Sequence, residues 1–184
     1  MSHPYKGFEP NWVSGEFPKD SYRSIFKWGD PLEIKAPRES LFKLMQQKFH
    51  LTEADFQTYT EDIGFDPVAF NLPISLPLSD IDHFSKIVGA DFVRTDDYAR
   101  LSVAYGKTMY DVLRLRNKIV ENVPDAVLYP DTKEQIEQIV AYCAERKIPV
   151  YVYGGGSSVT RGVECVKGGI SLDLRLRFNK VISF

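Results

Sequence analysis

The sequence has few of the residues that build metal centres and covalent scaffolds. It contains 2 cysteines and 3 histidines among 184 residues. Cys143 and Cys165 form no Cys-x-x-Cys pair, so neither a disulfide framework nor a metal site is expected. Cys143 falls on the apolar stripe of a predicted helix, where a free cysteine acts as a small hydrophobic residue.

The sequence also lacks a strong charge of one sign and any long hydrophobic run. Its 23 basic and 25 acidic residues give a net charge of -2, which predicts no general attraction to nucleic acid or to anionic membranes. No apolar run approaches the roughly 20 residues of a membrane span, and the N-terminus has no signal-peptide pattern. With 43% hydrophobic residues, the chain is predicted to be globular. The lack of a signal peptide and of a membrane span predicts a cytoplasmic protein. Because the net charge is small, any anion is expected to bind at a local site.

The last third of the chain predicts a strand, helix, strand unit. Residues 126 to 129 form a short apolar run closed by Pro130, which is typical of a buried strand. Residues 132 to 147 have helical periodicity and begin with a Thr-x-x-Gln capping box. Val150–Tyr153, rich in β-branched and aromatic residues, predicts the second strand.

A glycine-rich loop, Gly154-Gly155-Gly156-Ser157-Ser158, follows this second strand directly. Three consecutive residues without Cβ let the backbone approach a bulky anion, and their N–H groups can form an anion-binding nest. The alternative is a tight turn whose serines satisfy local backbone groups. A nicotinamide-type Rossmann site is disfavoured because the glycines follow the second strand, and the chain has no Gly-Lys-Ser/Thr ending for a Walker A loop.

These elements together resemble the flavin-binding domain shared by vanillyl-alcohol oxidase, p-cresol methylhydroxylase (PCMH) and their relatives. The resemblance begins at residues 124 to 130, Pro-Asp-Ala-Val-Leu-Tyr-Pro. It continues through the helix and the glycine loop to residues 169–174 and 179–182. The loop is most similar to the Gly-Gly-Gly-Thr-Ser version of the branch that contains alkyldihydroxyacetonephosphate synthase and the D-2-hydroxyacid dehydrogenases.

The resemblance to the synthase branch extends upstream. Residues 96–100, 105–106 and 113–116 are similar to the synthase sequence that precedes its flavin domain. Lys107 is a departure, because it stands where the synthase pattern has a histidine.

The resemblance implies an α+β fold, the N-terminal βαβ-containing half of a PCMH-type FAD-binding domain. Residues 121 to 184 would form the first part of this domain, and residues 1 to 120 a preceding arm and helical, aromatic-rich region. The loop would bind the FAD pyrophosphate, with Val152, Tyr153, Gly154, Gly155, Gly156, Ser157, Ser158, Val159 and Pro130 as cofactor-binding residues. Some relatives bond the flavin covalently to a histidine just after the glycines. Here that position is Ser157, so FAD is expected to bind non-covalently.

The region before residue 121 predicts helices and packing surfaces. The aromatic residues of segment 1–37 are expected to pack on a core or on a neighbouring subunit. The expected anchors are Tyr5, Phe8, Trp12, Phe17, Tyr22, Phe26 and Trp28. Residues 38–49 predict a helix with a core-facing stripe, and a further helix is expected to start at the cap Ser79 and to end at Gly89. A short helix is also expected from Thr52.

Several charged residues have two alternative predicted roles. Arg114, Arg116 and Lys118 recur at alternate positions, which places Arg114 and Lys118 on one side of a helix, and this run is expected to form a solvated face. The alternative is a contact with flavin or with an anionic substrate. Arg161 is expected to face a phosphate, or else to pair with Glu164. A last strand is predicted at residues 180 to 184.

The predicted function is that of the N-terminal portion of an FAD-dependent oxidoreductase or of an alkylglycerone-phosphate-synthase-like flavoenzyme acting on a small-molecule substrate. The alternatives are an FAD-linked D-2-hydroxyacid dehydrogenase and a non-enzymatic α+β interaction module. The family resemblance implies that the acid and base residues of catalysis lie outside these 184 residues. A strand edge exposed near residue 184 predicts self-association, and hence a homo-oligomer.

Overall fold

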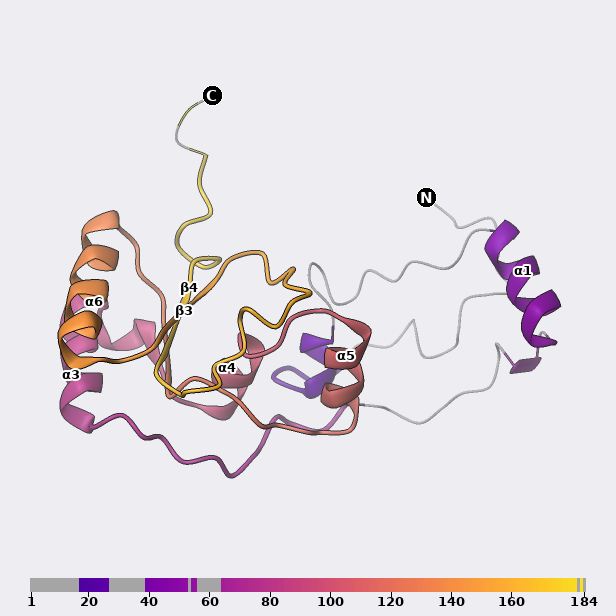
Figure 1. The fold of residues 1–184 in the computed structure, drawn as a ribbon, viewed down its shortest axis with the longest axis horizontal. Helices are drawn as coiled ribbons and strands as arrows, with labels where there is room; N and C mark the ends of the chain where they lie inside the picture. Colours follow the sequence, from indigo (N-terminus) through magenta and orange to yellow (C-terminus); the bar gives the residue numbers. More distant parts are fainter. Residues whose placement is uncertain (1–16, 27–38, 53, 56–63, 182, 184) are drawn as a thin grey trace.

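The computed structural model describes residues 17–26, 39–52, 54–55, 64–181 and 183 (Figure 1). Its elements are, in chain order, the 3₁₀ helix η3 (Tyr22–Ile25), α1 (Glu39–Phe49), α3 (Leu78–Val88), the 3₁₀ helix η4 (Ala90–Phe92), β1 (Val93–Arg94), α4 (Asp97–Ser102), α5 (Met109–Arg116), β2 (Ala126–Leu128), α6 (Lys133–Arg146), β3 (Val150–Tyr153) and β4 (Ile170–Asp173). No helix of the described residues is long and apolar enough to cross a membrane.

A four-stranded mixed sheet in the order β1-β2-β4-β3 organises the fold. β1 runs antiparallel to β2, whereas β2, β4 and β3 are mutually parallel. The predicted strand, helix, strand unit is therefore present as β2-α6-β3, with β4 inserted between its two strands. Because parallel strands end at the same edge of a sheet, the glycine loop after β3 lies beside the residues that follow β2 and β4.

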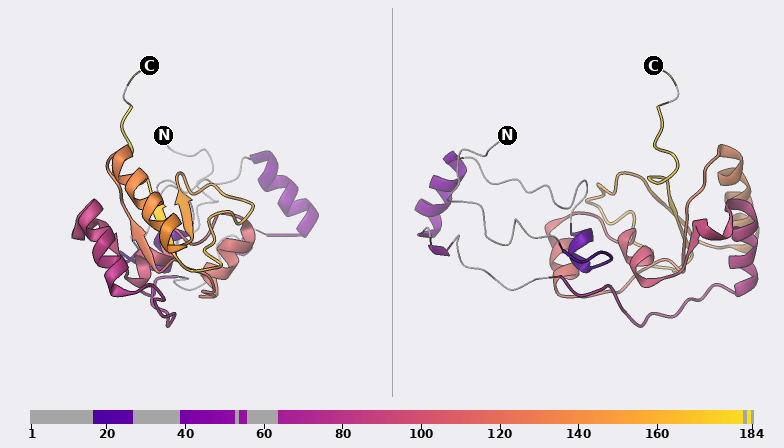
Figure 2. Two further views of the ribbon diagram at one scale, coloured as in Figure 1. Left: turned by 60° about the vertical axis from the view of Figure 1, so that its left-hand side comes forward. Right: turned by 180° about the vertical axis from the view of Figure 1, so that it is seen from behind.

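Helices cover both faces of the sheet, and the side chains of β2 alternate between them. One face packs against α3 and α6 in a buried cluster of Phe84, Val88, Ala126, Leu128, Ile139, Cys143, Ile148, Ile170 and Leu172. The opposite face packs against α4 through Ala99, Val103, Val127 and Tyr153. In Figures 1 and 2, α3 and α6 lie side by side on one side of the strands. The α+β class predicted from the sequence is confirmed.

The ends of α6 follow from local chemistry, with one difference from the capping box. Thr132 Oγ1 accepts a hydrogen bond from the Gln135 N–H at 3.3 Å, as predicted. The Gln135 side-chain oxygen accepts from the Asp131 N–H at 2.7 Å instead of returning to Thr132. At the other end, Lys147 closes the helix in the left-handed region with φ 57°.

The predicted N-cap of α3, Ser79, was wrong by two residues, because the observed cap is Pro77. The helix begins at Leu78, and the Pro77 carbonyl accepts from the N–H groups of Asp80 and Ile81, so Ser79 is inside the helix and not its cap. Proline fixes φ near its helical value, which suits it to the position before a first turn. The predicted end at Gly89 is confirmed, with φ 93°.

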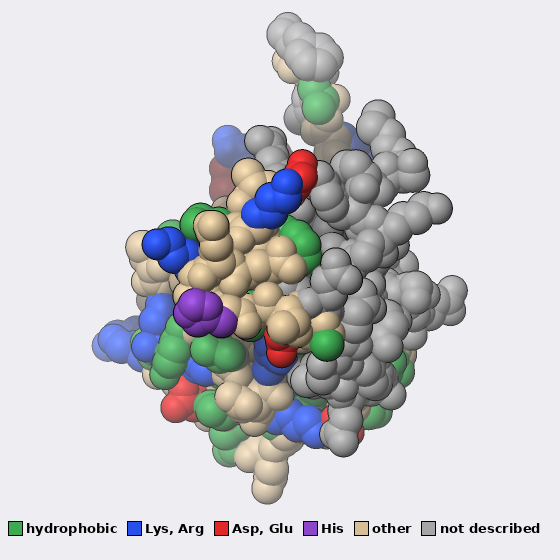
Figure 3. Space-filling model, turned by 90° about the vertical axis from the view of Figure 1, so that its right-hand side faces the viewer, with side chains coloured by type: hydrophobic (Ala, Val, Ile, Leu, Met, Phe, Trp, Pro, Cys, Tyr) green, Lys and Arg blue, Asp and Glu red, His purple; other side chains and the backbone are tan. Residues whose placement is uncertain are grey.

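Two further predictions were wrong: the core stripe of the helix at residues 38–49 and the strand at residues 180–184. The helix predicted at residues 38–49 forms as α1, but its apolar stripe is not a core stripe, because Leu41, Leu44 and Phe49 are exposed. Figure 3 views the molecule from the side on which α1 lies in Figure 1, and hydrophobic side chains are visible at the surface there. The strand predicted at residues 180–184 is not formed at Lys180, Val181 or Ser183; the other two residues lie outside the described chain.

Two of the predicted aromatic contacts of the N-terminal segment are confirmed. Tyr22 and Phe26 are buried in a second cluster with Ile25, Val68, Leu101, Ala104, Tyr105, Leu115 and Val123, which joins η3 to α4 and α5. The other aromatic residues of segments 1–16 and 27–38 lie outside the described chain, as do Glu53 and residues 56–63 of the short helix predicted from Thr52.

Candidate functional site

A cavity of about 490 Å³ lies where the parallel strands β2, β4 and β3 end. In parallel sheets this carboxyl edge is the usual place for a ligand, because loops rather than paired strands line it. The cavity is lined by Ser24, Ile25, Asp91, Phe92, Arg94, Tyr98, Ser102, Lys107, Tyr129, Tyr153, Gly155, Asp173, Arg175 and Leu176. These residues come from the N-terminal region as well as from the sheet, so both parts of the chain build the site.

The glycine loop brings unpaired backbone donors to this cavity. Within the described part of the chain, the N–H groups of residues 154–159 donate no hydrogen bond. A Cβ at Gly154 or Gly155 would meet no atom within 4 Å, so the space in front of both residues is open. Backbone N–H groups need partners, and donors held beside an open cavity are available to a bound anion.

Gly156 has a different role from the two glycines before it. Its φ is +68°, and a Cβ there would lie 2.3 Å from the Tyr153 hydroxyl oxygen. Only glycine fits this backbone so close to the ring. Gly156 therefore sets the path of the loop over Tyr153.

Tyr153, Asp173 and Arg175 form one wall of the cavity. Asp173, at the end of β4, accepts two hydrogen bonds from the Arg175 guanidinium, at 3.0 Å from Nε and 2.6 Å from Nη2. The Arg175 guanidinium carbon lies 4.5 Å from the centre of the buried Tyr153 ring. Tyr129 follows the neighbouring strand β2. Burial, together with the charge of Asp173, raises the pKa of Tyr129 to about 12.

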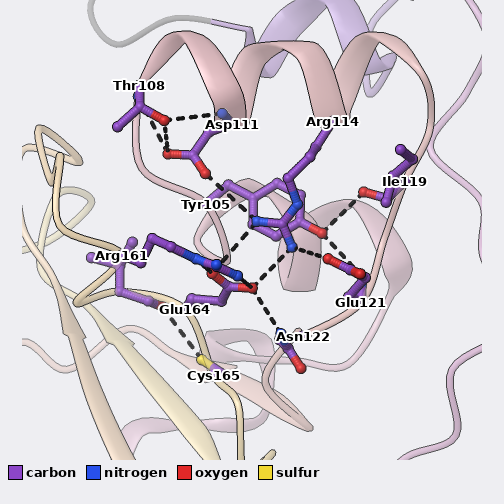
Figure 4. Close-up of polar contacts among 11 residues, drawn as sticks. Tyr105, Thr108, Asp111, Arg114, Ile119, Glu121, Asn122, Arg161, Glu164 and Cys165 are labelled. Atoms are coloured by element: carbon purple, nitrogen blue, oxygen red, sulfur yellow. Dashed lines mark hydrogen bonds and ion pairs between the residues drawn. The ribbon is translucent and has the colours of Figure 1, made fainter.

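A buried ion-pair network holds the far end of the β3–β4 segment (Figure 4). Glu164 accepts hydrogen bonds from Arg114 Nη2 at 2.9 Å, from Arg161 Nη2 at 2.8 Å and from the Asn122 side-chain amide at 2.7 Å. Burial acts to raise the pKa of Glu164, but these hydrogen bonds outweigh it and lower the pKa to about 2. The part of the β3–β4 segment around Glu164 is thus fixed to α5 and to the residues that follow α5.

This network corrects the prediction for Arg114. Its side chain is only 2% exposed and pairs with Asp111, Glu121 and Glu164, so it is no part of a solvated face. α5 ends at Arg116, and Lys118 has φ 54°, so Lys118 does not share a helix face with Arg114. Arg161 was expected to face a phosphate or to pair with Glu164, and the structure shows the pairing of its guanidinium with Glu164.

The structure brings most of the predicted cofactor-binding residues to one edge of the sheet. Tyr153 and Gly155 line the cavity; Gly154, Ser157 and Val159 are exposed beside it; Ser158 is partly buried. Val152 is 57% exposed on β3, and Pro130 is buried and does not line the cavity. Whether they bind FAD stays a prediction.

Sequence reasoning missed several residues of the cavity wall. Lys107 appeared only as a departure from a family pattern, and Asp173 and Arg175 were not connected with a site. An Asp-x-Arg sequence at the end of a buried strand is a usable signal, because its charges lie at the edge where ligands bind.

No cysteine or histidine of the described residues lines the cavity. Cys143 and Cys165 are buried, and burial raises their pKa values to about 11 and 12, so both thiols are protonated at neutral pH. His83 stacks on Tyr142 with ring centres 3.8 Å apart, on the side of α3 and α6. No group of His, Cys, Asp and Glu among the described residues has the arrangement to bind a metal ion.

Comparison with known proteins connects this chain with a cofactor. Residues 124–184 match the FAD binding domain family. Alkyldihydroxyacetonephosphate synthase of Trypanosoma brucei brucei is 33% identical over 84 residues, which cover 46% of this chain and 14% of that protein. Protein Rv2250A of Mycobacterium tuberculosis is 36% identical over 104 residues, covering 56% of this chain and 66% of that protein. Mitochondrial D-lactate dehydrogenase (cytochrome) of Arabidopsis thaliana is 36% identical over 55 residues, covering 30% and 10%.

The fold comparison agrees with the sequence matches. A solved structure of alkyldihydroxyacetonephosphate synthase superimposes with a TM-score of 0.57 at 28% identity, covering 60% of this chain and 22% of that chain. The matches therefore span only a small part of the length of the synthases. They confirm the predicted resemblance and cofactor: the chain carries an FAD-binding domain of the type found in alkyldihydroxyacetonephosphate synthase, and its cofactor is FAD.

Proposed function

We propose that residues 154–159 bind the pyrophosphate of FAD non-covalently, and that the chain is the FAD-binding portion of an FAD-dependent oxidoreductase or synthase-like flavoenzyme. The observation that carries this proposal is the run of loop N–H groups that have no acceptor among the described residues, held at the edge of the sheet beside a cavity. Charged phosphate oxygens are strong acceptors for such donors. The match of residues 124–184 to an FAD binding domain supports FAD as the source of these phosphates.

In this proposal the protein's own residues bind and orient the cofactor. The N–H groups of the loop donate to phosphate oxygens, and the open space at Gly154 and Gly155 admits the phosphates to the backbone. Non-covalent binding is supported by Ser157 at the position after the glycines and by a cavity lining that contains no histidine among the described residues. When bound, FAD supplies the redox-active ring on which a whole enzyme of this kind acts.

The central test is the substitution Gly155→Val. The valine side chain would meet no protein atom within 4 Å at its Cβ, but it would occupy the space proposed for the phosphates. We expect FAD affinity to fall by about tenfold or more, equivalent to roughly 1.4 kcal/mol or above, with little change in stability. FAD binding is measured by equilibrium dialysis or fluorescence quenching, and stability by urea unfolding.

Gly162→Val is the matched control. Gly162 lies in the same segment between β3 and β4, has no positive φ, and a Cβ there would approach no atom closer than 3.9 Å. This variant is expected to bind FAD as the unaltered chain does. Equal FAD affinities for both variants would show that the glycine loop is not the phosphate site.

The D-lactate dehydrogenase match supports a second candidate, an FAD-linked D-2-hydroxyacid dehydrogenase. When bound in such an enzyme, FAD would supply a ring that can take up a hydride from the substrate carbon that carries the hydroxyl group. Loss of the oxidised flavin absorption on anaerobic addition of D-lactate to the whole FAD-loaded enzyme, of which this chain would be the FAD-binding portion, would favour this candidate. An unchanged flavin spectrum would favour the synthase-like alternative, which involves no net redox change.

A further inference from the structure

Lys107 has a side chain whose charge has no acidic partner in the described part of the chain. Its ammonium group donates to the backbone carbonyl of Ile25 at 2.6 Å, and no described carboxylate lies within salt-bridge distance. Every other cation that lines the cavity has such a carboxylate, since Arg94 pairs with Asp96 and Arg175 with Asp173. A buried or half-buried charge is costly unless it is paired, so an unpaired cation on a cavity wall marks a place for an anion.

Lys107 is also attached to the glycine loop through its backbone. Its N–H donates to the Ser158 carbonyl at 3.1 Å. The preceding Gly106 packs so closely on this carbonyl that a Cβ would lie 2.1 Å from the oxygen. The backbone of Lys107 is therefore tied to the end of the glycine loop, and Lys107 and Gly155 line the same cavity.

We propose that Lys107 binds a phosphate group of FAD, so that its ammonium group and the N–H groups of the glycine loop form one anion site. This inference rests on the proposed function of the loop and adds a side-chain cation to it. Lysine suits this role as a compact point charge for phosphate.

The surroundings of Lys107 make the inference testable through pH. Burial lowers the pKa of Lys107 to about 8, the charge of Arg175 acts in the same direction, and Asp111 of α5 opposes them. The other titratable groups on the cavity wall are Asp91, Arg94, Tyr98, Tyr129, Tyr153 and Asp173. A bound phosphate would favour the charged ammonium and raise the pKa of Lys107. FAD binding would then take up a proton, and its affinity would fall as the pH rises through about 8.

The experiment measures the FAD dissociation constant of the purified chain between about pH 7 and 9.5, on either side of the Lys107 pKa. We expect Lys107→Met to weaken FAD binding by roughly tenfold or more at pH 7, the size of a lost charge-assisted hydrogen bond. The variant is also expected to lose the decline of affinity above pH 8. Lys107→Arg keeps a charge that does not titrate in this range, and is expected to bind FAD with no such decline.

Lys86→Met is the control for the loss of one positive charge, because Lys86 is exposed on α3 and does not line the cavity. It is expected to keep both the affinity and the pH dependence of the unaltered chain. If Lys107→Met fails to fold in a urea titration, the pH profiles of the unaltered chain and of Lys107→Arg still decide the question. A flat profile for the unaltered chain contradicts the role of Lys107.

The failure of this inference can be told apart from the failure of the proposed function. FAD binding that is lost in Gly155→Val but unchanged in Lys107→Met, at every pH, overturns the role of Lys107 and leaves the loop as the phosphate site. The absence of FAD binding by the unaltered chain, or equal binding by Gly155→Val and Gly162→Val, overturns both.

Discussion

The two halves of the segment between β3 and β4 differ in how their polar groups are used. The N–H groups of residues 154–159 donate no hydrogen bond within the described chain, whereas Glu164 accepts from Arg114, Asn122 and Arg161. The second half is thus fixed by buried ion pairs, and the first half presents free donors to a cavity. The difference shows that the free donors do not result from a loosely held loop, since the same segment is tied down a few residues later.

The largest expected loss of stability comes from Glu164→Ala, which removes the carboxylate at the centre of the buried ion-pair network. This substitution leaves the Arg114 guanidinium buried without its main partner, although Asp111 and Glu121 remain close. Breaking a buried ion pair in this way is expected to cost about 3 kcal/mol of unfolding free energy. Urea unfolding measures the loss, and FAD affinity is expected to fall with it because the loop is no longer held in place.

Acid is expected to reproduce part of this effect. The pKa of Glu164 in the folded chain is about 2, below the 4.5 of the free group. A lowered folded-state pKa means that the stabilisation is present above pH 4.5 and is lost as the pH falls towards 2. Glu164→Gln lacks the titrating group, so its stability should depend less on pH in this window. An identical pH dependence for both proteins would contradict the assigned role of Glu164.

A smaller effect on stability, and a sharper comparison, comes from alanine at two neighbouring glycines. Gly156→Ala forces a Cβ into a backbone with φ +68° and against Tyr153, which is expected to cost about 1–3 kcal/mol. Gly155→Ala places its Cβ in open space and should leave the unfolding free energy within about 0.5 kcal/mol. Equal losses in urea unfolding would contradict the separate roles of the two glycines.

The smallest effect is expected for Arg161→Ala. The side chain is 53% exposed, and its only described carboxylate partner, Glu164, keeps Arg114 and Asn122. We expect FAD affinity to change by less than about twofold, as is common for an exposed ion pair outside a binding site. A large loss of affinity without a loss of stability would instead make Arg161 a phosphate ligand, and would extend the binding half of the loop beyond residue 159.

Local patterns in the sequence were sufficient for the central elements. The helical periodicity and the Thr132 cap predicted α6 because a cap and an apolar stripe are written in adjacent residues. β3 and the glycine loop were predicted for the same reason. The resemblance to a flavin-binding family then supplied the cofactor, which periodicity alone does not encode.

The remainder depends on partners far away in the sequence. Arg114 is buried because Glu164, 50 residues later, folds onto it, and neither residue carries a local sign of this pairing. The cavity is equally non-local, since it joins Ile25 and Lys107 to the residues that follow the parallel strands. The apolar stripe of α1 correctly predicted a helix, but periodicity alone does not determine whether other residues bury the stripe.

The most direct measurement is the change of each backbone amide signal in a ¹H–¹⁵N NMR titration of the chain with FAD. The account predicts the largest shifts at residues 154–159, which have free N–H groups, and small shifts at residues 161–165, which the Glu164 network holds. FAD binding that leaves the signals of residues 154–159 in place and shifts those of another part of the chain would contradict the account.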